Sequence, residues 1–129
     1  MFRLERLFKN TTGELFNYLR KVEEAGDLII ERLQGAIDAA TIPVIEEGLK
    51  GRIEKYLDKN ILLDFKDVTH VDSATLAALI ILLDQLQCHH RRLGIINPHP
   101  ELMSYLAIEK IDKLVRVYED EAQAVADLR

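Results

Sequence analysis

The segment from Ile61 to Leu83 constrains the fold most, because it places a short buried strand just before a long apolar helix. Residues 61–65 form a nearly continuous apolar run, which is typical of a strand covered on both faces. Residues 73–92 are predicted to form a helix, and within it Leu76–Leu83 is uninterruptedly apolar. Strands that alternate with helices predict parallel strand pairs joined by right-handed crossovers.

The rest of the chain continues this alternation. Further strands are expected at 28–33, ending at Gly35, at 93–96 and at 114–118. Further helices are expected from Thr41, with Pro43 in the first turn, from Pro100, and over 121–128. The sequence therefore predicts an α/β fold, with a mixed sheet of about four strands flanked by helices.

The N-terminal part carries a different pattern. Thr11 and Glu14 have the spacing of a capping box, and apolar residues then recur at helical spacing at Leu15, Phe16, Leu19 and Val22. We predict an amphipathic helix over 12–25, in an N-terminal extension of residues 1–26 that precedes a domain at 27–129. The apolar face of this helix could dock on the sheet, or it could pair with a second subunit to form a homodimer.

Composition excludes several classes of function. The 129 residues include 17 basic and 22 acidic side chains, a formal charge of −5, which does not provide the basic surface that nucleic acids require. The longest apolar run, Leu76–Leu83, is far shorter than the roughly 20 residues of a membrane-spanning helix. The lone cysteine, Cys88, excludes an internal disulfide and fits a reducing compartment, so we expect a cytoplasmic protein.

The residues suited to catalysis do not form a recognisable site. Cys88, His89 and His90 are adjacent, and neighbouring side chains on a helix point about 100° apart, so they cannot converge on one metal ion. The six glycines are scattered and form no phosphate-binding loop. We therefore expect neither a metal, nor a cofactor, nor an enzymatic activity.

The junction of Asp72 and Ser73 is the most informative site. In the structural reading, either residue is the N-cap of the following helix. In the functional reading, a kinase phosphorylates the serine at the exposed helix terminus. A phosphate there would meet unpaired N–H groups and the positive end of the helix dipole. Its charge of about −1.5 to −2 would also repel an acidic partner.

A family resemblance accompanies these residues. The segment 61–73, with Asp72-Ser73 before two small residues and an apolar helix, resembles the centre of a STAS domain. This is the fold of bacterial anti-sigma factor antagonists and of sulfate-transporter tails. The segments 33–38 and 94–98 are similar to other parts of that domain, and Glu121 opens a closing helix in the expected place. The resemblance covers roughly residues 27–128.

The resemblance implies a function. In the antagonists, the matching serine is phosphorylated by an anti-sigma factor that is itself an ATP-using serine kinase. The unphosphorylated form binds that kinase, and a phosphatase restores binding. Ser73 would be the acceptor, with Thr75, which replaces a family glycine, as a second candidate. The partner-binding residues would then be Asp38, Asp72, Ala74, Thr75, Leu76, Leu79 and Ile80.

Two departures from the family pattern leave alternatives open. One is Thr75, and the other is the helix predicted over 12–25, where simple antagonists have a short hairpin strand. The chain could instead be a stressosome-like scaffold subunit, assembled through its N-terminal helix. It could also be a regulatory or ligand-binding STAS module associated with an anion transporter.

Overall fold

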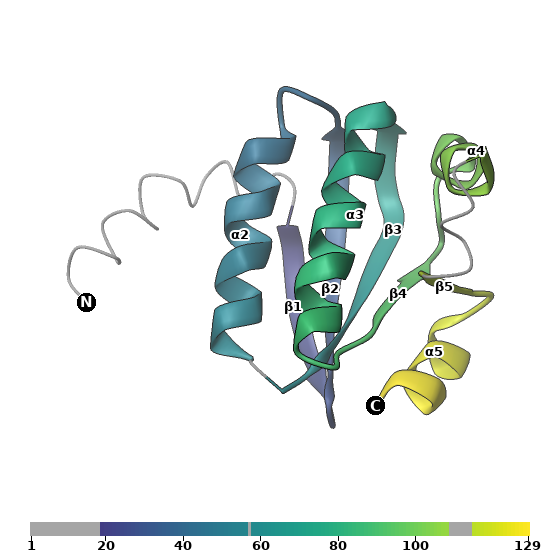
Figure 1. The fold of residues 1–129 in the computed structure, drawn as a ribbon. Coiled ribbons are helices and arrows are strands. Elements are labelled where there is room, and N and C mark those ends of the chain that lie inside the picture. Colours follow the sequence, from purple (N-terminus) through teal and green to yellow (C-terminus); the bar gives the residue numbers. More distant parts are fainter. Residues whose placement is uncertain (1–18, 57, 109–114) are drawn as a thin grey trace.

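The computed structural model describes residues 19–56, 58–108 and 115–129. Within these ranges the chain alternates strands and helices, as expected for an α/β fold (Figure 1). The elements are, in chain order, β1 (Leu19–Ala25), β2 (Leu28–Ile37), α2 (Ile42–Lys55), β3 (Asn60–Val71), α3 (Ser73–Cys88), β4 (Leu93–Ile96), α4 (Pro100–Ile108), β5 (Arg116–Tyr118) and α5 (Glu121–Leu128).

The strands form one mixed sheet in the order β1-β2-β3-β4-β5. β1 and β2 pair antiparallel, whereas the pairs from β2 to β5 are parallel, as the alternation predicts. Helices α2 and α3 lie side by side over one face, and α5 covers the other (Figure 1). The carboxyl ends of the parallel strands therefore lie at one edge, where loops lead into the next helices.

The sheet has five strands rather than about four, because the helix expected over 12–25 is wrong for residues 19–25. This segment is β1, and the first seven residues of the expected helix lie outside the described residues. Gly26 adopts a left-handed conformation (φ 62°), and Ala25 pairs with Leu28 across a two-residue turn. Pairing with β2 gives the segment a ladder of backbone hydrogen bonds. These bonds stabilise a strand, although the spacing of its apolar residues is that of a helix.

Most other elements occur where the sequence predicts them, although the ends of several differ from the expected ends. β4 and α5 span the expected residues, whereas the strand expected at 61–65 extends from Asn60 to Val71 as β3. β2 continues through Gly35 to Ile37, because Gly35 takes a positive φ of 79° at a register shift without ending the strand. The helix expected to reach residue 92 ends at Cys88. The division expected at residue 26 falls in the β1–β2 turn and stays a prediction.

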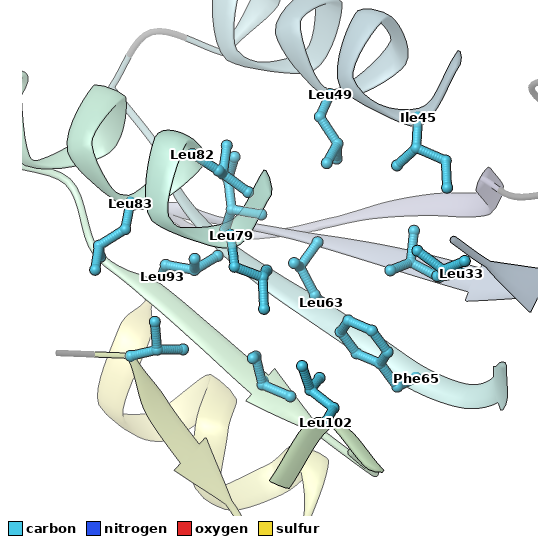
Figure 2. Packing of buried hydrophobic residues seen from close by; sticks show 14 of the residues in the cluster. Leu33, Ile45, Leu49, Leu63, Phe65, Leu79, Leu82, Leu83, Leu93 and Leu102 are labelled. Atoms are coloured by element: carbon cyan, nitrogen blue, oxygen red, sulfur yellow. The ribbon is translucent and has the colours of Figure 1, made fainter. Parts of the chain in front are cut away.

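The core has one cluster on each face of the sheet. The larger lies beneath α2, α3 and α4, where Ile45, Leu49, Leu79 and Leu82 point toward strand residues such as Leu63 (Figure 2). The smaller lies beneath α5 and consists of Leu28, Ile30, Leu62, Ile96, Ala124 and Leu128.

Gly94 allows α5 to pack closely on β4. A Cβ atom at this position would lie 2.6 Å from Leu128 Cδ1 and 3.0 Å from Tyr118 Cε2. The first distance is shorter than real Cβ contacts and the second is tighter than most, so with a larger residue at 94 the Leu128 and Tyr118 side chains would have to shift. No helix among the described residues is long and apolar enough to cross a membrane.

Candidate interaction site

The candidate site lies where the carboxyl ends of β2 and β3 meet. β2 leads through residues 38–41 into α2, and β3 leads through Asp72 into α3. The backbone N–H of Asp72 donates to the carbonyl of Ile37, at 3.3 Å. The two strand ends, 35 positions apart in sequence, are thus joined side by side.

The Asp72 side chain accepts hydrogen bonds from both segments that meet at this junction. It is the N-cap of α3, and its Oδ1 accepts a hydrogen bond of 2.9 Å from Ala74 N. Its Oδ2 accepts a second bond of 3.1 Å from Ala39 N, on the β2–α2 loop. The capping role expected from the sequence is present, together with a second bond that ties the loop to the helix.

Hydrogen bonds within the loop at 38–41 also stabilise its conformation. Asp38 Oδ1 accepts hydrogen bonds from the N–H groups of Ala40 and Thr41, at 3.0 and 3.1 Å. The Thr41 hydroxyl accepts from Asp38 N and donates to the carbonyl of Ala36. Asp38 is half-buried, and its backbone lies in the same short loop that Asp72 contacts. The structure therefore brings Asp38 and Asp72, two residues of the expected partner-binding set, into one junction.

The two candidate phosphoacceptors face opposite ways. Ser73, the first residue of α3, is exposed. Thr75 is only 2% exposed, and its hydroxyl donates a 2.9 Å hydrogen bond to the Ile37 carbonyl beneath the helix. The geometry therefore leaves the Ser73 side chain exposed to solvent and commits the Thr75 hydroxyl to the fold.

An exposed stripe runs along α3 from Ser73. Ala77, Ile80 and Asp84 follow at intervals of three or four residues and are all exposed, so they share the outer side of the helix. Ile80 is 45% exposed and the adjacent Ile81 53%, which is unusual for isoleucine.

The residues expected at the rim of the docking surface are divided between surface and core. Ile80 lies on the exposed stripe and Ala74 is half-buried beside Ser73. Leu79 is buried, and Leu76 is half-buried against the same core cluster. A helix that is apolar all round gives no periodic signal of which face turns inward, and the sequence could not separate these residues.

An ion cluster on the opposite side of the sheet fixes the strands that carry the site. Arg32 on β2 contacts Asp64 on β3 at 2.8 Å, Glu121 on α5 at 2.6 Å, and Glu23 on β1. Asp64 also accepts hydrogen bonds from the Asn97 side chain and from the backbone of Lys66, both at 2.9 Å.

The electrostatics of Asp64 follow from these contacts. Burial alone would raise the pKa of the carboxyl group. The hydrogen bonds from Asn97, Lys66 and Arg32 outweigh burial and hold the pKa below its usual value. Asp64 is therefore a structural anion, well separated from Ser73 by its position on the other face.

Glu31 is the corresponding buried carboxylate beneath α2. It contacts Arg52 Nε at 3.2 Å, its side chain is 1% exposed, and its Oε1 atom has no hydrogen-bond partner among the described residues. Burial raises the pKa of Glu31 to about 7, because the attraction and hydrogen bond of Arg52 only partly offset the loss of water. This carboxylate is costly to the fold when it is ionised.

Metal ligation has no support among the described residues, which contain no group of three or more candidate side chains able to hold an ion. Cys88 ends α3, and His89 and His90 lie in the turn after it, all three exposed. His70 and Glu101 form an exposed pair at 3.4 Å.

Comparison with known proteins identifies the family. A family model of the STAS domain matches residues 20–124, which is most of the chain. The chain belongs to the STAS domain family. The match begins inside β1, so the β1–β2 hairpin is included in the STAS region.

Solved STAS structures share the fold. A proposed anti-sigma factor antagonist from Thermotoga maritima superposes with a TM-score of 0.77 at 17% identity, covering 84% of this chain and 93% of that one. An anti-sigma factor antagonist from Mycobacterium paratuberculosis gives 0.74 at 19% identity, over 84% and 92%. The Bacillus cell fate determinant SpoIIAA in its phosphorylated form gives 0.68 at 17%, over 84% and 98%.

Sequence reasoning missed the long-range half of the candidate site. Ala39 and Thr41 hold the loop next to Asp72, and the only local signal was the pair Asp38 and Thr41, whose types favour turns. The Thr75 contact to Ile37 spans 38 positions and has no sequence signature. The sequence predicts a helix where simple antagonists have a short hairpin strand, and the structure has a hairpin strand there, β1.

Proposed function

We propose that this STAS protein is a non-catalytic interaction module switched by phosphorylation. When Ser73 is unphosphorylated it binds a serine-kinase type of anti-sigma factor, phosphorylation of Ser73 ends the binding, and a phosphatase restores it. The observation that carries the proposal is the exposure of Ser73 at the first residue of α3, beside a junction held together by its neighbours.

The switch would act on the surface and not on the fold. The bonds that hold the junction run through Asp72 before Ser73 and through Thr75 after it. A phosphate on Ser73 would add a charge of about −1.5 to −2 next to the Asp72 carboxylate and near Asp38, at one end of the stripe formed by Ala77 and Ile80. A partner that covers the stripe would have to bury that charge or be repelled by it.

The proposed contact surface consists of Asp38, Asp72, Ala74 and Ile80, with the half-buried Leu76 at its edge. Ala77 joins it, since it is exposed on the same stripe of α3 as Ile80. Thr75 supports this surface from below. The proposal therefore assigns the acceptor role to Ser73 alone.

Relatives of similar fold support a regulatory role. Three of them are described as anti-sigma factor antagonists, one of these as a proposed one. SpoIIAA, one of the three, has been determined in both phosphorylated and unphosphorylated forms. In this proposal ATP binds to the partner kinase, the chain itself needs no cofactor, and the exchange takes place in the cytoplasm.

The test is transfer of phosphate to the full chain. The chain contains two serines, Ser73 and Ser104, both exposed on helices, so Ser104 provides a matched control. The wild type, Ser73→Ala and Ser104→Ala are incubated with labelled ATP and fractions of a lysate from the source organism, and the site is located by mass spectrometry. We expect label on the wild type and Ser104→Ala and loss of label from Ser73→Ala. Equal labelling of all three, or label on Thr75, would overturn the assignment.

A further inference from the structure

An apolar groove lies between α2 and α3 and is separate from the switch residue. Its volume is about 340 Å³, enough for a few large side chains. The floor is formed by the strand residues Leu33, Ile37, Leu63 and Phe65. Ile42 and Ile45 contribute from α2, and Leu79, Leu82 and Ile81 from α3. Figure 1 shows the two helices side by side above the sheet.

The groove reaches the surface at Ile81, whose side chain is 53% exposed. Exposing large isoleucine side chains beside an apolar cavity raises the free energy of the protein. Covering them with a further apolar segment lowers it. Its outer rim on α2 carries Glu46 and Glu47, both exposed, together with Lys50. An occupant with apolar side chains and basic neighbours would therefore match both the interior and the rim.

The first 18 residues of the chain have this composition. Three of the four phenylalanines of the protein fall there, and the large apolar side chains of the segment are Met1, Phe2, Leu4, Leu7, Phe8, Leu15 and Phe16. Arg3, Arg6 and Lys9 are interleaved with the first of them, against Glu5 alone among residues 1–9. Residues 1–9 therefore combine basic and apolar side chains, whereas the chain as a whole is acidic.

The segment joins the described structure close to the groove. It joins the described structure at Leu19, whose backbone pairs with that of Leu33, a residue of the groove floor. Even at the helical rise of about 1.5 Å per residue, 18 residues span about 27 Å, more than twice the roughly 10 Å diameter of a helix such as α2. The segment is therefore long enough to pass over α2 and reach the groove from the edge of the sheet.

We propose that residues 1–18 occupy the α2–α3 groove of their own chain, with apolar side chains between Phe2 and Phe8 against Ile81 and the floor, and with Arg3 and Arg6 beside Glu46 and Glu47. This contact is intramolecular, and it does not depend on whether Ser73 is phosphorylated. A second copy of the chain is the competing occupant.

Paramagnetic broadening in the full chain tests the proposal. In a Cys88→Ser background, a spin label is attached through Asn10→Cys, and amide signals are compared with those of the unlabelled protein. We expect loss of intensity at Lys50, Ala78 and Ile81 around the groove, and unchanged intensity at Ala126 on α5. Unchanged groove signals, or equal broadening on both faces, would overturn the proposal.

Two pairs of variants sharpen the result. Ile81→Glu should abolish the broadening, whereas Met103→Glu, which changes another exposed apolar residue on α4, should not. Glu46→Lys with Glu47→Lys should reduce it, whereas Glu54→Lys, exposed on α2 outside the groove, should leave it unchanged. If isotope-labelled chains without a spin label are broadened to the same extent when they are mixed with separate spin-labelled chains, the occupant is a second copy and the intramolecular proposal is wrong.

Discussion

Two hydroxyl groups in the first turn of α3 have opposite surroundings. The Ser73 side chain is exposed to solvent, whereas Thr75, two residues later, is 2% exposed and its hydroxyl donates to the Ile37 carbonyl. Positions two apart on a helix point about 200° apart, so one hydroxyl faces outward when the other faces the sheet. The same residue chemistry therefore gives a solvent-exposed group at one position and a structural group at the other.

The difference shows where this fold tolerates a new charge. An outward position keeps its water, so a charge there costs the fold little and alters only what can bind. An inward position loses its water and has fixed partners, so a charge there costs stability. Substitutions that change the charge at inward and outward positions therefore test this difference.

The largest effect is expected from Thr75→Asp. A carboxylate at this buried position would lose its water and would face the Ile37 carbonyl, another acceptor, so we expect a loss of at least about 3 kcal/mol in unfolding free energy. Urea denaturation measures it. Thr75→Val removes only the hydrogen bond and should cost about 1 kcal/mol. A Thr75→Asp protein as stable as the wild type would show that this position is not inward in solution.

Glu31 is an inward charge that the chain already has, and Glu31→Gln measures its cost. The folded pKa is raised to about 7 from an ordinary 4.5. Folding therefore loses stability as the pH rises from about 4.5 to about 7, because the unfolded chain ionises first. We expect the stability of Glu31→Gln relative to the wild type to increase by about 3 kcal/mol across this interval. Urea denaturation at pH 4.5 and pH 8 checks it, and a constant difference would contradict it.

Asp72→Ala should have an intermediate effect, because it removes the cap of α3 and the bond to Ala39 together. We expect a loss of about 2 kcal/mol. Asp120→Ala is the matched control, since Asp120 caps α5 through Gln123 N, and it should cost about 1 kcal/mol. Equal losses in the two variants would mean that the bond between Asp72 and the loop adds nothing.

The smallest effect on stability is expected from Ser73→Asp. The substituted carboxylate would stay in water at the amino end of a helix, where negative charge is mildly favourable. We expect a change within about 0.5 kcal/mol, visible as an almost unchanged melting temperature, with Ser104→Asp as the control. A clear loss of stability at Ser73 would remove the distinction between the two hydroxyls.

The parallel part of the fold could be predicted from the sequence because its signals are local. The apolar run at 61–65, the cap at Asp72 and the short strand at 93–96 all mark elements that the structure contains. β1 could not be predicted in the same way. Its apolar spacing fits a helix, and only its pairing with β2 decides for a strand.

The site was predictable in part for the same reason. Asp72 and Ser73 stand next to each other at a helix start, which a sequence reveals. Which neighbours of Ser73 face outward depends on how α3 is rotated against the sheet, and eight successive apolar residues carry no period from which to infer it. The bonds from Asp72 to Ala39 and from Thr75 to Ile37 depend on the parallel pairing of β2 with β3, which is known only from the structure.

The central claim is that the state of Ser73 controls partner binding, and capture of partners tests it most directly. Wild type, Ser73→Asp and Ser104→Asp are immobilised as full chains and exposed to a lysate of the source organism, and bound proteins are identified by mass spectrometry. The account predicts that an ATP-binding serine kinase is recovered by the wild type and Ser104→Asp, and is lost from Ser73→Asp. Recovery of the same partners in equal amounts by all three would contradict it and leave Ser73 as no more than the first residue of α3.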